Sequence, residues 1–286
     1  MLPHHVHYFS KHLNPEVKEV YWFAGINSLA LTLSFIFEPI YLYQLGYSLV
    51  NIMWFYFQVY VWFSVLIFLG AKVASRVGYK HSMLIGSIMY ILYWTALYNI
   101  KSIPELFFVA PLFFALQKSF FWPAYDAEVA LASKRVQRGR ELGALMSVVE
   151  IIAIVGPFFG GLISLTLGFG ALFLTSGTLL LIAVYPLFKS PEVYTEHNFE
   201  FKNFQQVIKK HWRNFWGYWG MAEDLILTNL WPLYIFLTIP HFLGVGSVAT
   251  FAGLTSAMLM LYIGKVTDKS NKQTLIRKVS FFYGLT

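Results

Sequence analysis

Long apolar segments separated by short polar segments dominate this chain. Each segment approaches or exceeds about 20 mostly apolar residues, the length that a helix needs to cross the hydrocarbon core of a bilayer. We expect transmembrane helices near residues 20–45, 49–71, 82–99, 104–131, 142–166, 170–188, 215–239 and 245–263, with a ninth beginning near Val279. The pattern predicts an all-α integral membrane protein with about eight complete transmembrane helices and the start of a ninth.

The composition agrees with this pattern. Hydrophobic residues make up 57% of the 286 residues, aromatic residues 19% and charged residues 12%, whereas soluble domains carry about 25% charged residues. A soluble core of this size has no room for so much apolar surface, and the chain contains no cysteine. These numbers exclude a water-soluble enzyme, a disordered protein and a disulfide-stabilised scaffold.

The positive charges are distributed unevenly between the two predicted membrane faces. The formal net charge is +7, and 19 of the 21 Lys and Arg residues lie in segments on the same side as the N-terminus. Positively charged loops remain cytoplasmic, so we expect a multi-pass protein of the plasma (inner) membrane with a cytoplasmic N-terminus. These charges lie in short loops and form no basic face, so nucleic acid is not an expected partner.

An internal repeat suggests two related halves. The segment around Pro39 resembles the segment around Pro232, 193 residues later, and the same offset superimposes the loop at 71–80 on 264–273 without a gap. Secondary transporters are commonly built from such repeats. We expect a six-helix bundle at 1–188, a cytoplasmic linker at 189–214 and a partial second bundle at 215–286. A second half of equal length requires roughly 100 further residues and four more spans.

The repeated loop carries a motif. The major facilitator superfamily has the signature Gly-x-x-x-Asp-Arg/Lys-x-Gly-Arg/Lys-Arg/Lys in this loop, and the sequence resembles that family. It departs from the signature in the first copy, where Ala71 and Ser75 replace Gly and Asp. The matching residues are Gly264, Asp268 and Lys269 in the second copy and Arg76, Gly78 and Lys80 in the first. The resemblance implies two six-helix halves with a substrate cavity between them.

The fifth predicted span contains a glycine-rich segment. Its residues Gly156, Pro157, Gly160 and Gly161 resemble the antiporter signature Gly-Pro-x-x-Gly-Gly of the same family, although Ile152 replaces an expected glycine. Small residues four positions apart let helices approach closely, and proline bends a helix. The segment therefore either shapes the cavity or its seal, or simply allows tight packing.

The cations of the first loop lie at the predicted cytoplasmic surface. We expect Arg76 or Lys80 to approach Asp126 or Glu128, at the same end of the fourth span. Such an ion pair acts as a latch if it forms in one state of the cavity and breaks in the other. The alternative is that these cations only set the topology.

Charged residues inside a membrane are costly and indicate functional positions. The predicted spans contain five such residues: Glu38, Lys118, Glu150, Glu223 and Asp224. Lys118 and Glu150 both fall near the middle of the bilayer on consecutive helices, so we expect them to form an ion pair. The pair is either static or opened by substrate or a proton.

The other acidic residues have two interpretations each. Asn27, Ser34 and Glu38 share a helical face, which we expect to line the cavity; alternatively Glu38 lies hydrated at the outer mouth. Glu223 or Asp224 is suited to binding a proton or a cationic substrate, or both are hydrated near the cytoplasmic end.

Polar and aromatic residues extend the candidate site. Gln58 is expected to line the cavity, and Trp122 and Tyr125 follow Lys118 on one helical face. An aromatic cavity favours amphipathic or cationic ligands, although such residues more commonly serve packing. The sequence contains no phosphate-binding loop and no recognisable metal or cofactor site.

Taken together, these patterns predict a secondary active transporter that moves a small solute by alternating access. The resemblance in the fifth span favours a proton-coupled exporter of organic compounds. A nutrient symporter for a sugar or organic acid and a non-transporting membrane fragment remain alternatives. A membrane enzyme would need a polar catalytic cluster, which the sequence lacks. The expected partners of a transporter are the lipid bilayer, a small-molecule substrate and protons.

Overall fold

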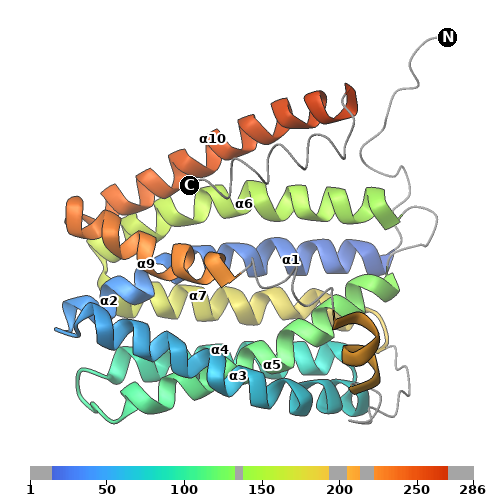
Figure 1. Ribbon diagram of the computed structural model, residues 1–286, viewed down its shortest axis with the longest axis horizontal. Helices are drawn as coiled ribbons and strands as arrows, with labels where there is room; N and C mark the ends of the chain where they lie inside the picture. The colour runs from blue at the N-terminus through green and yellow to red at the C-terminus, as the bar shows by residue number, and fades with distance from the viewer. Residues whose placement is uncertain (1–14, 133–137, 193–204, 213–221, 270–286) are drawn as a thin grey trace.

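The computed structural model describes residues 15–132, 138–192, 205–212 and 222–269, and these residues form a bundle of long helices (Figure 1). The elements are α1 (Pro15–Ser34), η1 (Phe35–Phe37), α2 (Glu38–Gln44), α3 (Leu49–Val77), α4 (Tyr79–Asn99), α5 (Leu106–Ala132), α6 (Arg138–Thr166), α7 (Gly168–Val184), η2 (Tyr185–Lys189), α9 (Ala222–Thr238) and α10 (Phe242–Lys269). Residues 205–212 form a further short helix.

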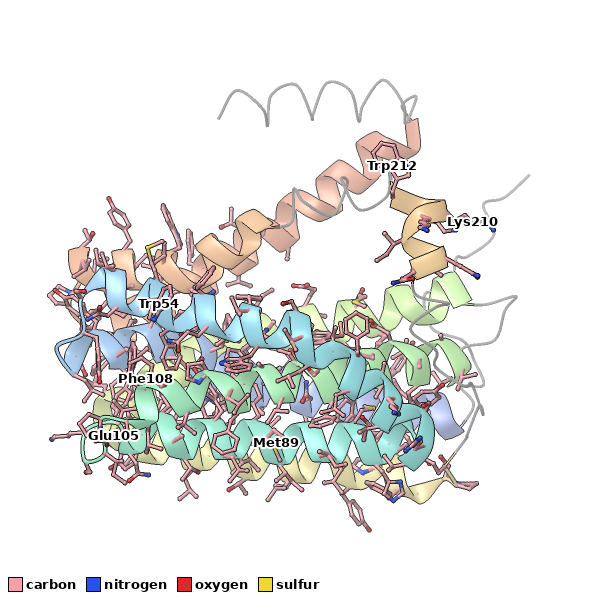
Figure 2. All side chains as sticks on the ribbon, turned by 60° about the horizontal axis from the view of Figure 1, so that its bottom comes forward. Trp54, Met89, Glu105, Phe108, Lys210 and Trp212 are labelled. Atoms are coloured by element: carbon pink, nitrogen blue, oxygen red, sulfur yellow. The ribbon has the colours of Figure 1, made fainter. Side chains whose placement is uncertain are left out.

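Several of these helices are suited to crossing a membrane. Among the described residues, five segments are long and apolar enough: Val17–Gln44, Leu49–Val77, Leu106–Leu131, Leu145–Thr166 and Gly168–Lys189. Large apolar side chains such as Trp54 and Phe108 point outward from the bundle (Figure 2), as expected of a lipid-facing surface. The chain is therefore an all-helical, multi-pass membrane protein, and the total of about eight spans stays a prediction.

The bundle has two distinct ends. At one end α1 begins, α3 ends, α4 begins and η2 ends; we call this the basic end, because Lys80 and Lys189 lie there. At the other end α2 is followed by the start of α3 and α9 by the start of α10 (Figure 1). We call it the opposite end.

The first span is not a continuous α-helix. Pro39 is at the start of α2, and because proline has no N–H it cannot donate to the preceding helical turn. The backbone responds with the 3-10 turn η1 between α1 and α2. This interruption places Glu38 at the first position of α2, where it is fully buried.

Glycines set the spacing of the helices. A Cβ atom at Gly70 would overlap the backbone carbonyl of Ser119, so α3 and α5 approach with almost no room between their backbones. Helices α5 and α4 also pack closely, whereas α6 packs against α1, α7 and α10. Figures 1 and 2 show that α10 lies near α6 at the opposite end and diverges from it toward the basic end.

The helix boundaries agree with the offset of the repeat. Helix α10 begins at Phe242, which is 193 positions after Leu49 at the start of α3 (242 − 49). Pro39 lies in α2, and Pro232 lies inside α9. One pair of helix starts, those of α3 and α10, therefore agrees with the offset, and the repeat of the two halves stays a prediction.

The close contact at Gly70 leads to the first prediction. We expect Gly70→Ala to destabilise the protein by about 1–3 kcal/mol, because the added methyl group meets backbone atoms that cannot rotate away. The matched control is Gly177→Ala, where the added Cβ would lie 3.5 Å from Ile91, an ordinary contact. Thermal unfolding in detergent, followed by tryptophan fluorescence, measures both variants, and equal stability of the two would contradict the prediction.

Candidate functional site

Glu38 accepts two hydrogen bonds inside the bundle. Its side chain is fully buried. Tyr93 donates its hydroxyl to Oε2 at 2.8 Å, and Trp94 donates Nε1 to Oε1 at 2.7 Å. Both donors are consecutive residues of α4, so each oxygen of the carboxylate is held by one of them. Hydrogen bonds to a buried carboxylate offset part of the cost of removing it from water.

Lys118, a residue of α5, supplies the cation near Glu38. Its Nζ is 4.6 Å from the ring centroid of Phe114 and 5.5 Å from that of Tyr60, in cation–π geometry. Glu38 is also close enough to act electrostatically on Lys118. We call Glu38, Lys118 and the aromatic residues that touch them the central site.

Stacked rings surround the central site. Tyr90 stacks on Trp94, with ring centroids 4.3 Å apart, and Tyr93 stacks on Phe114 at 4.6 Å. Tyr56 of α3 belongs to the same buried cluster. Aromatic pairs in such geometry add stability beyond the burial of their area. The charged groups therefore lie in a closely packed aromatic environment.

The predicted ion pair between Lys118 and Glu150 is not formed within the described structure. Glu150 is exposed on α6, which packs against α1, α7 and α10, whereas α5 packs against α3 and α4. The sequence argument assumed that two helices joined by a short loop are neighbours. In this bundle the chain crosses to a different face between α5 and α6, and Glu38 of α2 takes the place of Glu150.

The face formed by Asn27, Ser34 and Glu38 does not line an open cavity. Asn27 is 8% exposed and Ser34 is fully buried, and the Ser34 hydroxyl is 2.5 Å from that of Ser176 in α7. Glu38 faces α4. Glu38 is therefore not hydrated at an outer mouth in this structure, and its predicted position beside a substrate cavity stays a prediction.

The remaining predicted site residues make none of the hydrogen bonds or ring contacts to Glu38 or Lys118 that the described parts of the chain contain. Trp122 is 44% exposed, and Tyr125 stacks on Phe121. The side-chain nitrogen of Gln58 is buried without a hydrogen-bond partner among the described atoms. The structure does not describe the side chains of four further predicted residues or the surroundings of Gly264, although their backbones belong to α9 and α10. The four residues are Glu223, Asp224, Asp268 and Lys269.

A second cluster of charges lies at the basic end. Lys80 is only 2% exposed and donates to the Ser190 hydroxyl at 2.6 Å and to the carbonyls of Ser190 and Pro191 at 3.2 and 3.3 Å. Its Nζ is 3.8 Å from carboxylate oxygens of both Glu19 and Glu128. Ser190 in turn donates to Glu19 at 2.6 Å. Lys80 thus joins α1, α4, α5 and the segment that follows η2.

Glu192 caps the first turn of α4. Its carboxylate accepts from the backbone N–H groups of Lys80 at 3.0 Å and His81 at 3.3 Å, and lies 2.7 Å from Nδ1 of His81. An acidic group is favourable at a helix N-terminus, where N–H groups have no partner within the helix. Gly78 makes the contact possible: its φ is 98°, and a Cβ there would overlap Glu192.

The sequence left four pairings open, of Arg76 or Lys80 with Asp126 or Glu128, and the structure contains one of them, Lys80 with Glu128. Arg76 and Asp126 are exposed, and no ion pair joins them in the described parts of the chain. Sequence reasoning missed Glu19, Ser190 and Glu192. A buried lysine needs several acceptors, and this requirement would have pointed to such partners. The sequence, however, did not show that Lys80 is buried.

The glycine-rich segment of α6 forms two helix contacts. Added Cβ atoms at Gly156 and Gly160 would overlap Thr32 and the Leu33 carbonyl of α1, and one at Gly161 would overlap the Phe242 carbonyl of α10. Across the second contact, Gly246 faces the Pro157 carbonyl. Thr250 donates to the carbonyl of Ile154 at 2.7 Å. The segment therefore holds α6 tightly between α1 and α10.

A family model described as Major Facilitator Superfamily matches residues 20–285. The chain belongs to the major facilitator superfamily. A comparison with curated proteins finds no match. The match includes every residue of the central site and all of the basic-end cluster except Glu19.

Membership of the major facilitator superfamily sets the general activity. The protein is a secondary transporter that handles a small molecule within a lipid bilayer. In the part of the chain that the structure describes, no group of three or more His, Cys, Asp or Glu residues is placed to hold a metal ion. The charged groups of this superfamily member are instead arranged as a buried site and a basic-end cluster.

Removing Lys80 tests the energetic role of the basic-end cluster. We expect Lys80→Met to destabilise the protein by about 3–5 kcal/mol, because it leaves the carboxylates of Glu19 and Glu128 buried without their cation. Lys101→Met, which removes an exposed lysine in the turn between α4 and α5, changes stability by only about 0.5 kcal/mol. Thermal unfolding in detergent compares the two, and similar losses would show that Lys80 contributes no more than a surface charge.

Proposed function

We propose that this protein is a proton-coupled secondary transporter of small organic compounds, with Glu38 as the residue that binds the coupling proton. One observation carries the proposal: a fully buried carboxylate lies near a half-buried ammonium within an aromatic environment. Charges inside a membrane protein are expensive. A carboxylate that takes up a proton when it is accessible from one side of the membrane, and releases it on the other, links movement of the proton to movement of the solute.

Alternating access fits the way α6 and α10 meet. The two helices touch through glycines at the opposite end, and α10 diverges from α6 toward the basic end (Figure 1). We propose that this contact holds the two helices together while α10 moves relative to α6 as access alternates. We assign the basic end to the cytoplasm and the protein to the plasma (inner) membrane, because positively charged loops remain inside.

The basic-end cluster is suited to the role of a cytoplasmic latch. Lys80 and Glu192 tie the start of the proposed linker at 189–214 to α4. We propose that the two halves at 1–188 and 215–286 move relative to each other about this anchored segment. Ion pairs at the surface of one half then form or break as the cytoplasmic side opens and closes.

The direction of transport has two candidates. Export in exchange for protons follows from the resemblance of Gly156–Gly161 to an antiporter signature, but the contacts of these glycines support a packing role that is independent of direction. Symport of a nutrient is favoured instead by the neutral pairing of Glu38 with Lys118, which binds a proton and an anion together. A non-transporting fragment is the conclusion if no solute moves.

A disulfide between α6 and α10 tests alternating access. A Cβ atom at Gly253 would lie 3.7 Å from the Cβ of Ile154, within the range of disulfide geometry. The chain has no cysteine, so the double variant Ile154→Cys/Gly253→Cys carries only this pair. We expect oxidation to block transport and reduction to restore it, with both single variants unaffected by oxidant. Undiminished transport after complete cross-linking contradicts the proposed movement of the two halves.

Proton coupling is tested in proteoliposomes that contain the complete protein and the internal pH indicator pyranine. A panel of organic acids, sugars and amines is added outside, and protein-free liposomes correct for passive permeation. We expect at least one solute to drive proton movement, and Glu38→Gln to abolish it because an amide cannot release a proton. The control is Glu105→Gln, which alters a surface carboxylate at the opposite end (Figure 2).

A further inference from the structure

The ammonium of Lys118 makes no hydrogen bond to an acceptor. Its described contacts are the ring faces of Tyr60 and Phe114, and no described carboxylate is within ion-pair distance. An ammonium has three N–H donors, and those of Lys118, a half-buried residue, meet no acceptor among the described atoms. Glu38 does not provide one directly, because its two oxygens receive hydrogen bonds from Tyr93 and Trp94.

A second donor close by is also unsatisfied. The hydroxyl of Tyr56 is buried beside Tyr93, whose own hydroxyl donates to Glu38, and it forms no hydrogen bond of good geometry with a described atom. Tyr56 and Tyr60 are four residues apart on α3, so they share a helical face, and Tyr60 lies against Lys118. Donors from α3 and α5 therefore converge where the structure provides no acceptor, and a solute oxygen is the group that completes this geometry.

Charge balance then decides which solute fits. Glu38 and Lys118 together carry no net charge, so an anion bound at Lys118 leaves one uncompensated negative charge in a buried site. Such a charge is strongly disfavoured. A proton on Glu38 removes it. A cationic solute, in contrast, meets the like charge of Lys118 and leaves its donors without an acceptor.

Glu38 is the group in this site that is suited to taking up the proton. The titratable groups that face it are Tyr56 from α3, Tyr90 and Tyr93 from α4, and Lys118 from α5. Phenols are already protonated at neutral pH, and Lys118 carries the charge that attracts the anion. In the described part of α9, which packs against α2, the titratable side chain is Tyr234, which is 59% exposed.

We infer that the central site binds a small organic anion at Lys118 and Tyr56 together with a proton at Glu38, so that the two move in the same direction. This inference rests on the proposed function and adds the substrate class and the coupling. The aromatic rings of Tyr60 and Phe114 favour an anion with an apolar body over a strongly hydrated inorganic ion.

The test uses permanently charged solutes, because weak acids cross bilayers in their neutral form. Proteoliposomes with the complete protein and an inward proton gradient receive radiolabelled methanesulfonate, benzenesulfonate or naphthalenesulfonate. Benzyltrimethylammonium and glucose serve as the cationic and neutral comparisons. We expect the gradient to drive accumulation of at least one sulfonate and of neither comparison solute. Accumulation of the cation or of glucose, without any sulfonate, overturns the inference but leaves the proposed proton coupling intact. A pyranine signal without sulfonate uptake has the same meaning.

Two variants separate the roles of the charged residues. Glu38→Gln imitates the protonated carboxyl, so we expect it to retain sulfonate exchange at all pH values while losing accumulation driven by the proton gradient. Lys118→Ala is expected to lower exchange about tenfold or more, the effect of losing a charge-assisted hydrogen bond, and Lys118→Arg to restore much of it. A merely structural role predicts loss of exchange in Glu38→Gln as well. That result, or normal exchange by Lys118→Ala, overturns the inference.

Discussion

The cost of burying charge in a membrane protein governs the arrangement of this molecule. Glu38 is buried within the first span, and Lys80 is almost as deeply buried at the basic end. Neither is stable there without partners, since an unpaired buried charge is strongly destabilising. Tyr93 and Trp94 hold the first, and two carboxylates, a hydroxyl and two carbonyls surround the second.

The same helices supply both charged clusters. The first span contributes Glu19 at the basic end and Glu38 to the central site. From the basic end inward, α4 contributes Lys80 and then Tyr93, and α5 contributes Glu128 and then Lys118. A shift of any one of these helices therefore disturbs both clusters at once. This shared support is a physical basis for coupling the protonation of Glu38 to contacts at the basic end.

Close helix contacts hold the N-terminal helices together more extensively than they hold α10. At Gly70 and Gly160 the backbones of neighbouring helices meet almost directly, which holds the N-terminal helices together as a unit. The contact between α6 and α10 is similar at Gly161 and Gly246, but it covers only part of α10, which diverges beyond it (Figure 1). One tight and one partial contact on the same helix suit α6 to the border between the two proposed halves.

The sequence by itself determined the membrane class, the family and the all-helical fold, and it limited the contact at the basic end to Arg76 or Lys80 with Asp126 or Glu128. Each depends on local information: the length of apolar segments, the spacing of glycines and charges, and the side of the membrane on which a loop lies. The partner of Lys118 depended instead on which helices lie side by side. Glu150 lies on the helix that follows the one carrying Lys118, but that helix packs against α1, α7 and α10, and the carboxylate that acts electrostatically on Lys118 is Glu38. Only the tertiary structure decides such neighbours, since backbone contacts at Gly70 and Gly160 set the helix order, and the sequence shows these glycines without showing what they touch.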